Sequence, residues 1–184
     1  MPRIHMPGSS HGCGGDPRLC APDGFPLPQL RNGRTYCWDP YVAGSPQITT
    51  LLAAMQWIEV NLVATTGPSR QTCDADFASF GHHIPLSEWW RNQAIWISYN
   101  PSPASTEYGA TLGGTLDITI SQNAFARGVH QVAGTLIHEF AHINNAGDGR
   151  RAEQTLRQCG CADIYDPQIV GSLGLPRGSS IRRA

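Results

Sequence analysis

The stretch GVHQVAGTLIHEFAHIN, residues 128–144, has the periodicity of a helix with one apolar face. Its apolar residues recur at spacings of three and four, which places them in a single stripe. The stripe comprises Val129, Val132, Ala133, Leu136, Phe140 and Ile143. At 3.6 residues per turn, His138 and His142 fall opposite this stripe, about 40° apart around the helix axis. We therefore predict a helix from about Gly128 to Asn144 that turns two histidines away from its apolar face.

The spacing of His138 and His142 suits the binding of one cation. Residues i and i+4 lie one turn apart on the same face, so both imidazoles can reach the same zinc ion. Glu139 is offset around the helix, which places its carboxylate beside a water molecule on the metal. Zinc lowers the pKa of such a water toward about 7, and a nearby carboxylate can remove its proton. The pattern predicts His138 and His142 as zinc ligands and Glu139 as general base.

A catalytic zinc ion commonly has three protein ligands and one open position, so a third ligand is expected. Asn and Gly residues in the run 144–149 predict a turn after the first helix. A second helix is predicted from about Arg150 to Gln158, folding back toward the end of the first. Glu153 lies in its first turns and is the favoured third ligand. A solvent-facing glutamate near a helix N-terminus is the alternative interpretation.

Three further residues near these helices are candidates for the site. Asp148 is the alternative third ligand, although an Asp just before Gly149 also suits the N-cap of the second helix. Asp163 is a more distant candidate for the same role. Tyr165 is a candidate catalytic residue that would donate a hydrogen bond to the oxyanion of a tetrahedral intermediate. A packed surface tyrosine is the alternative role for Tyr165.

The segment Leu136–His142 resembles the active-site helix of the zincin metallopeptidases, over about residues 116–161. The resemblance implies a zincin-like fold, Zn²⁺, His138 and His142 as ligands, and Glu139 as general base. The strand expected at 116–121 takes the place of the rim strand that binds an extended substrate in zincins. Ala152-Glu153 after a short loop is similar to compact gluzincins and to deuterolysin-like peptidases, which have Asp where this chain has Glu153. The same region resembles metallopeptidase toxin domains that bacteria deliver through secretion systems.

The rest of the chain predicts one α+β domain over residues 1–184. Helical spacing of apolar residues from Pro46 to Ala64, with Ser45 as N-cap, predicts a second long helix. Strands are predicted at 93–100 and at 116–121, the latter half-buried because apolar and polar residues alternate. We expect a small mixed or antiparallel sheet packed on the two long helices. Residues 1–45 are rich in Cys, Pro and Gly and predict an irregular arm before a catalytic core at 46–184.

The six cysteines are numerous for a reducing compartment and predict disulfides. They are Cys13, Cys20, Cys37, Cys73, Cys159 and Cys161. Cys159 and Cys161 are too close to bridge each other comfortably, so each is expected to reach a distant partner. This pattern predicts a protein that is secreted, or delivered to an oxidising compartment such as the extracellular space or the periplasm.

Charge and hydropathy limit the classes of partner. The formal net charge is −1, which gives no electrostatic reason to expect nucleic acid, and no apolar run approaches the ~20 residues of a membrane span. The leading hypothesis is a secreted or injected zinc endopeptidase, an effector or toxin with a protein or peptide substrate and an inhibitor or immunity protein as a further partner. The alternatives are a zinc amidase acting on cell-wall peptides and a non-enzymatic, disulfide-braced binding module.

Overall fold

A computed structural model describes residues 1–7, 39–101, 107–111, 116–147 and 149–161 of the chain. The predictions for Asp148, Asp163 and Tyr165, and those for Cys13, Cys20 and Cys37, lie outside the described residues. Within the described part, no single helix is long and apolar enough to cross a membrane.

The first long helix, α1 (Pro46–Ile58), continues into a π-helical turn, η2 (Glu59–Val63), which confirms the helix predicted at 46–64. Ser45 is its N-cap, and the Ser45 side chain accepts a hydrogen bond from the backbone amide of Ile48. The residues of the predicted apolar spacing, such as Leu51 and Ile58, are fully buried. This helix therefore forms one wall of the core.

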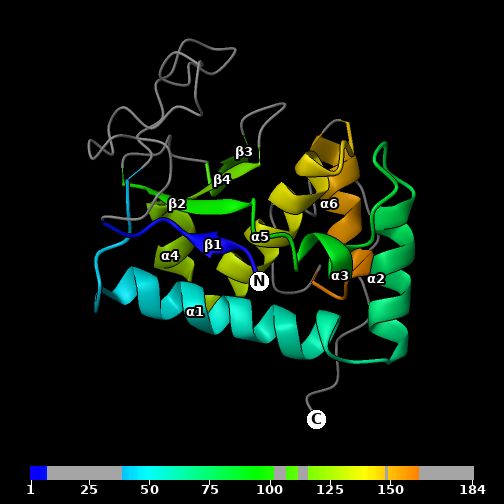
Figure 1. The fold of residues 1–184 in the computed structure, drawn as a ribbon, viewed down its shortest axis with the longest axis horizontal. Coiled ribbons are helices and arrows are strands. Elements are labelled where there is room, and N and C mark those ends of the chain that lie inside the picture. The colour runs from blue at the N-terminus through cyan, green and yellow to red at the C-terminus, as the bar shows by residue number, and fades with distance from the viewer. Residues whose placement is uncertain (8–38, 102–106, 112–115, 148, 162–184) are drawn as a thin grey trace.

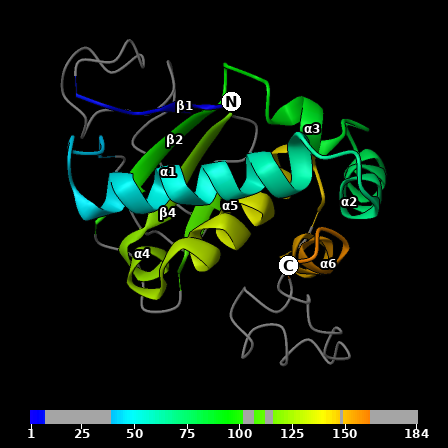
Figure 2. The same cartoon turned by 90° about the horizontal axis from the view of Figure 1, so that it is seen from below.

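Four strands form a mixed sheet in the order β1-β2-β4-β3. The strands are β1 (Arg3–Ile4), β2 (Trp96–Asn100), β3 (Gly109–Thr111) and β4 (Asp117–Ser121). The pairs β1–β2 and β2–β4 are parallel, whereas β3 runs antiparallel to β4. The α+β class and the mixed sheet are thus as predicted, and helices α1, α4 (Gln122–Arg127) and α5 (Val129–Ile143) lie on one face of the sheet (Figures 1 and 2).

Strand β4 corrects two expectations. It is not half-buried, because all five of its residues are buried between β2 and β3. Its polar side chains tolerate burial by bonding to the neighbouring backbone: Thr119 donates to the Ala110 carbonyl and Ser121 to the Glu107 carbonyl. Nor is β4 the rim strand, since β3 stands at the end of the sheet.

The expectation of an irregular arm fails at its two ends. Strand β1 extends the sheet beside β2, and Tyr41 lies in the hydrophobic core. His5 is buried, and its Nδ1 lies 3.1 Å from the Ser98 hydroxyl. The first residues of the chain are therefore part of the domain that carries the long helices.

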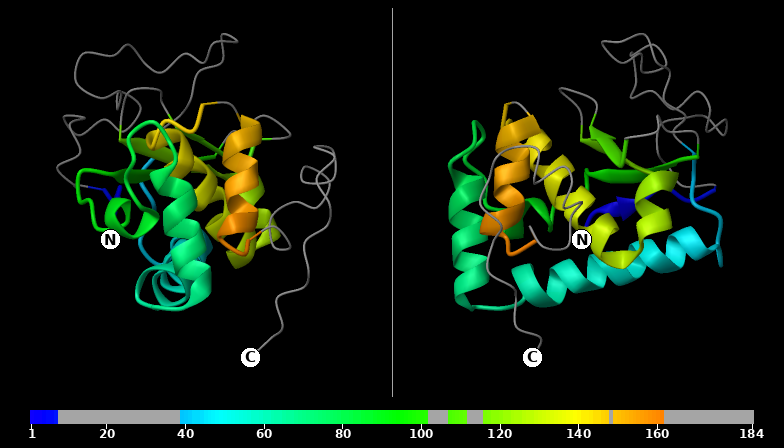
Figure 3. Two further views of the ribbon diagram at one scale, coloured as in Figure 1. Left: turned by 90° about the vertical axis from the view of Figure 1, so that its right-hand side faces the viewer. Right: turned by 180° about the vertical axis from the view of Figure 1, so that it is seen from behind.

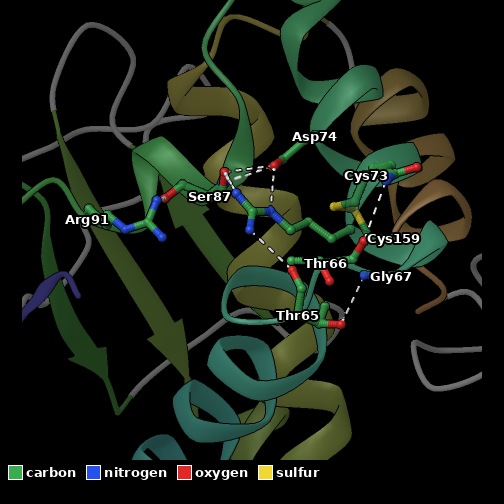
Figure 4. Close-up of polar contacts among 10 residues, drawn as sticks. Thr65, Thr66, Gly67, Cys73, Asp74, Ser87, Arg91 and Cys159 are labelled. Atoms are coloured by element: carbon green, nitrogen blue, oxygen red, sulfur yellow. Dashed lines mark hydrogen bonds and ion pairs between the residues drawn. A yellow bond between two sulfur atoms is a disulfide. The ribbon is translucent and has the colours of Figure 1, made fainter.

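The segment 69–92 contains two helices, α2 (Pro68–Ala78) and α3 (Leu86–Trp89). Its large aromatic residues belong to the core: Phe77, Phe80, Trp89 and Trp90 are all buried. The Asp74 carboxylate accepts hydrogen bonds from the Ser87 amide and hydroxyl and so joins α2 to α3 (Figure 4). This arrangement fixes α2 at the end of the molecule that also carries α6 (Gly149–Gln158).

Candidate metal centre

Helix α5 lies at the centre of the fold and confirms the helix predicted at 128–144. From Gln131 to Ile143 all of its residues are buried except His138 and His142, which are partly exposed. Helix α5 is surrounded by α1, α4, α6, β3 and β4, all of which contact it. The buried surface of the helix therefore opens only at the two histidines.

The imidazole rings of His138 and His142 converge on each other. Their Nε2 atoms lie 3.1 Å apart, with ring centroids separated by 4.8 Å. Two nitrogens held at about 2.0–2.1 Å from a tetrahedral zinc ion are separated by about 3.3 Å, which is close to the spacing found here. Since two imidazole lone pairs repel each other, this geometry needs a proton or a cation between the rings. The pair fits two ligands of one metal ion.

Glu153 of α6 lies beside His138, on the ring nitrogen that faces away from the pair. Its Oε1 atom is 3.0 Å from His138 Nδ1. A carboxylate in this position fixes the orientation and tautomer of a ligating imidazole and leaves Nε2 for the metal. The second oxygen, Oε2, is buried and has no hydrogen-bond partner within the described part of the chain. Glu153 is thus placed to support His138 from behind the ring, and not between the two histidines where the predicted third ligand would lie.

The charges around His138 favour its protonated form in the absence of metal. Burial acts to lower the pKa of His138, but the pairing with Glu153 and the charges of Glu139 and Glu153 raise it, and the net result is a raised pKa. A cation would take the place of this proton, because metal ligands must be deprotonated. The surroundings of His138 are therefore suited to positive charge.

Helix α6 is held in place by α2, so Glu153 has an independent anchor. A disulfide joins Cys73 of α2 to Cys159 of α6 (Figure 4). Asp76 of α2 accepts hydrogen bonds from Arg151 at 2.7 Å and from Thr155 at 2.9 Å. The two helices run side by side in Figures 1 and 3, and their bonds fix the position of Glu153 relative to α5.

The free cysteine of this region corrects one prediction. Cys161 was expected to reach a distant partner, but it is a buried, free thiol that forms no disulfide with the other described cysteines. Its sulfur lies 3.5 Å from the Cys159 carbonyl oxygen, and burial raises its pKa above that of an ordinary thiol. The prediction of a distant partner for Cys159 is confirmed.

A complete three-ligand set is not assembled among the described residues: no group of three His, Cys, Asp or Glu side chains there is placed to hold a metal ion. His138 and His142 are brought together, and Glu153 is brought to His138. His82 and His83 both lie exposed, and the His82 ring packs against Trp89. These two histidines add nothing to the pair.

The Glu139 carboxylate is buried beneath the edge strand β3, with only 4% of the residue exposed. The Thr111 hydroxyl lies 2.8 Å from Glu139 Oε2 and donates a hydrogen bond to it. A Cβ atom at Gly109 would lie only 3.0 Å from Glu139 Oε1 and 2.5 Å from Thr135 Cγ2. Glycine at this position therefore allows the strand to approach the helix closely.

Sequence patterns did not single out Gly109 or Thr111, because β3 has three residues and no apolar alternation. The weak signal was a glycine two residues before a hydroxyl side chain, which many loops also contain. Only the antiparallel pairing with β4 brings this strand over Glu139.

Burial determines the acidity of Glu139 in the metal-free protein. Burial raises the pKa of Glu139, His138 and the Thr111 hydrogen bond lower it, and the charges of Glu107 and Glu153 raise it, so that the net pKa lies above the ordinary value of 4.5. A bound cation would oppose this shift. In the metal-free protein, the folded carboxyl binds its proton more tightly than the unfolded one. Glu139 therefore contributes fully to the free energy of unfolding at pH values below the pKa of the carboxyl in the unfolded chain. This contribution is lost as the pH rises through the pKa of the carboxyl in the folded protein.

We expect Glu139→Gln to stabilise the metal-free fold at about pH 8 and to change it little near about pH 4, where the wild-type carboxyl is mostly protonated in both states. Glutamine fills the same space and does not ionise, so the cost of burying a carboxylate is removed. Denaturant unfolding in the presence of a chelator would measure the difference between the two proteins, which should widen as pH rises. A difference that is constant with pH would contradict the assignment of this burial cost to Glu139.

Comparisons with protein-family models, curated proteins and solved structures found no match to this chain. The functional argument therefore rests on the arrangement of the described residues themselves.

Proposed function

We propose that this protein is a zinc-dependent peptidase with a zincin-like active site, acting as an endopeptidase on protein or peptide substrates. The observation that carries the proposal is the convergence of the His138 and His142 Nε2 atoms to 3.1 Å, at the two partly exposed residues of the otherwise buried segment 131–143. Glu139 follows His138 on the same helix, and Glu153 orients the His138 ring from behind. A pair of incidental histidines would have no need of this supporting carboxylate.

The residues of the chain divide the chemistry among them. His138 and His142 would hold zinc through their Nε2 atoms. Glu153 is the third ligand proposed from the sequence, with Asp148 as the alternative. In this structure the Glu153 carboxylate lies at His138 Nδ1, so it would have to move to reach the metal. When bound, zinc would supply Lewis acidity toward the peptide carbonyl and toward water. Glu139 would accept the proton of the attacking water and return it to the leaving amine. Its burial beneath β3 keeps bulk water from competing for that proton.

The edge position of β3 supports an extended peptide as substrate. Strand β3 pairs with β4 on one side, and its other side pairs with no further described strand. An extended peptide can add to such an edge by main-chain hydrogen bonds. Because Gly109 and Thr111 of the same strand contact Glu139, a peptide bound there would pass beside the proposed base.

Secretion, or delivery as an effector or toxin, completes the proposal. The Cys73–Cys159 bridge is compatible with an oxidising compartment such as the extracellular space or the periplasm. A protein of this kind also needs control where it is made, which an inhibitor or immunity protein would supply.

Metal binding and chelator-sensitive hydrolysis test the proposal directly. Protein purified without chelator is expected to contain about one zinc ion per chain and to cleave a fluorescent casein, with activity lost in a chelator and restored by zinc. His138→Ala and His142→Ala are each expected to lose the metal, because a single remaining imidazole cannot hold it. Elemental analysis and anomalous scattering at the zinc edge would measure occupancy and identify the third ligand.

His130→Ala is the matched control for the metal measurement. His130 lies on the same helix, is exposed, and packs its ring against Trp57, away from the pair. The control should keep full zinc occupancy. Wild-type protein that neither contains nor takes up zinc would overturn the proposal. Zinc uptake with hydrolysis of cell-wall peptides but not of proteins would instead support the amidase.

A further inference from the structure

Two residues of strand β3, Gly109 and Thr111, lie against the carboxylate of Glu139. Side chains at i and i+2 of a strand point to the same face, so residues 109 and 111 both face α5 while Ala110 faces away. Residue 109 offers only a glycine Cα to the Oε1 side of Glu139, and residue 111 offers a hydroxyl to Oε2. The pairing of Gly109 with Ile120 and of Thr111 with Ile118 fixes this register.

The Thr111 hydroxyl is the one described group that donates a hydrogen bond to the Glu139 side chain. It also lies 3.2 Å from the Glu139 backbone carbonyl, but its single proton is better used on the closer, charged oxygen. The last torsion of a glutamate side chain is soft, so an unrestrained carboxylate rotates readily. One hydrogen bond to Oε2 restrains that torsion and so fixes the plane of the carboxylate beneath β3.

We propose that Thr111 is a positioning residue for catalysis, holding the Glu139 carboxylate through Oε2 in the orientation in which it serves as the base. The inference rests on the proposed function, because a base requires a reaction. It also links substrate binding to catalysis, since the strand that would pair with an extended peptide is the strand that carries Thr111.

Substitutions that differ only in the hydroxyl test this role. Thr111→Val keeps the shape of the side chain and removes the donor, and it is expected to lower kcat by roughly 10–100-fold with KM changed by less than about threefold. Thr111→Ser retains the donor and should keep kcat within about threefold of wild type. Zinc content should stay at the wild-type value in both variants, and the melting temperature should fall in Thr111→Val but not in Thr111→Ser, because the buried carboxylate loses its donor only in the valine variant. Steady-state kinetics on one peptide substrate would give the separate effects on kcat and KM.

Thr119→Val is the matched control. The Thr119 hydroxyl also joins β3 to β4, through the Ala110 carbonyl, but it does not contact Glu139. Its loss should leave kcat within about twofold of wild type. In the Glu139→Gln background, Thr111→Val should cause no further loss, because its effect acts through the carboxylate. A wild-type kcat in Thr111→Val, or an equal loss in Thr111→Ser, would overturn the inference.

A second readout separates this inference from the proposed function. In zinc-free protein, the ¹³C resonance of the Glu139 carboxyl is expected to shift in Thr111→Val and to stay in place in Thr119→Val. An unshifted resonance would show that the hydrogen bond is absent and would overturn the inference by itself. If Thr111→Val shifts the resonance but the wild-type protein hydrolyses no peptide, the hydrogen bond exists and the proposed function is wrong. The catalytic role of the contact would then fall with it.

Discussion

Glu139→Gln is expected to lower kcat for peptide hydrolysis by roughly 10²–10⁴-fold while the protein keeps its zinc. The side chain has nearly the same shape, so the buried space beneath β3 stays filled and Thr111 keeps a hydrogen-bond acceptor. An amide cannot accept the proton of the attacking water at neutral pH, so the proposed chemical step loses its base. Hydrolysis of a quenched fluorescent peptide, with zinc content measured on the same preparation, gives both quantities.

Two comparisons make this result specific. Glu88→Gln removes an exposed carboxylate on α3 that is not part of the histidine pair, and should leave the rate unchanged. His138→Ala should lose activity together with metal, whereas Glu139→Gln should lose activity alone. Full activity in Glu139→Gln would show that another group supplies the base. Loss of zinc from Glu139→Gln would show that this carboxylate helps to hold the metal.

The sequence was most informative for helix α5, where the same helical periodicity predicts both the buried face and the position of the two histidines. Helix α5 combines an apolar stripe with two histidines one turn apart, and the structure places both as the stripe requires. The sequence predicted Glu153 as a third zinc ligand, because a short turn after α5 makes α6 fold back toward its end; the structure brings the carboxylate to Nδ1 of His138. Which nitrogen of His138 the carboxylate would reach depends on side-chain packing, which periodicity does not describe.

The sequence was misleading where polar residues are satisfied inside the fold. Alternating polar residues in β4 predicted a solvent-facing side, but Thr119 and Ser121 bond to backbone carbonyls and are fully buried. His5, near the start of the chain, is likewise buried, and its ring meets Ser98. In each case the partner lies far away in sequence, so only the sheet pairing reveals that burial is tolerated.

Removing the Cys73–Cys159 bridge by a double substitution to alanine is expected to lower the free energy of unfolding by about 2–5 kcal/mol. The bridge closes a loop with a sequence separation of 86 residues, and long loops gain the most chain entropy when the link is cut. Because the bridge fixes α6 against α2, its loss should also weaken zinc binding by roughly 10-fold, as Glu153 holds His138 less firmly. Denaturant unfolding and zinc titration on the same variant would measure the two effects.

Cys161→Ala separates the bridge from the general packing of α6. Cys161 is equally buried and lies two residues from Cys159, but it is not bridged to a described cysteine. Its substitution should cost only about 1 kcal/mol and leave zinc affinity unchanged. Asp76 still binds Arg151 and Thr155 in the double alanine variant, so α6 should remain helical and loosely docked. If zinc affinity survives loss of the bridge unchanged, these polar contacts alone position Glu153, and the disulfide contributes to stability without shaping the metal centre.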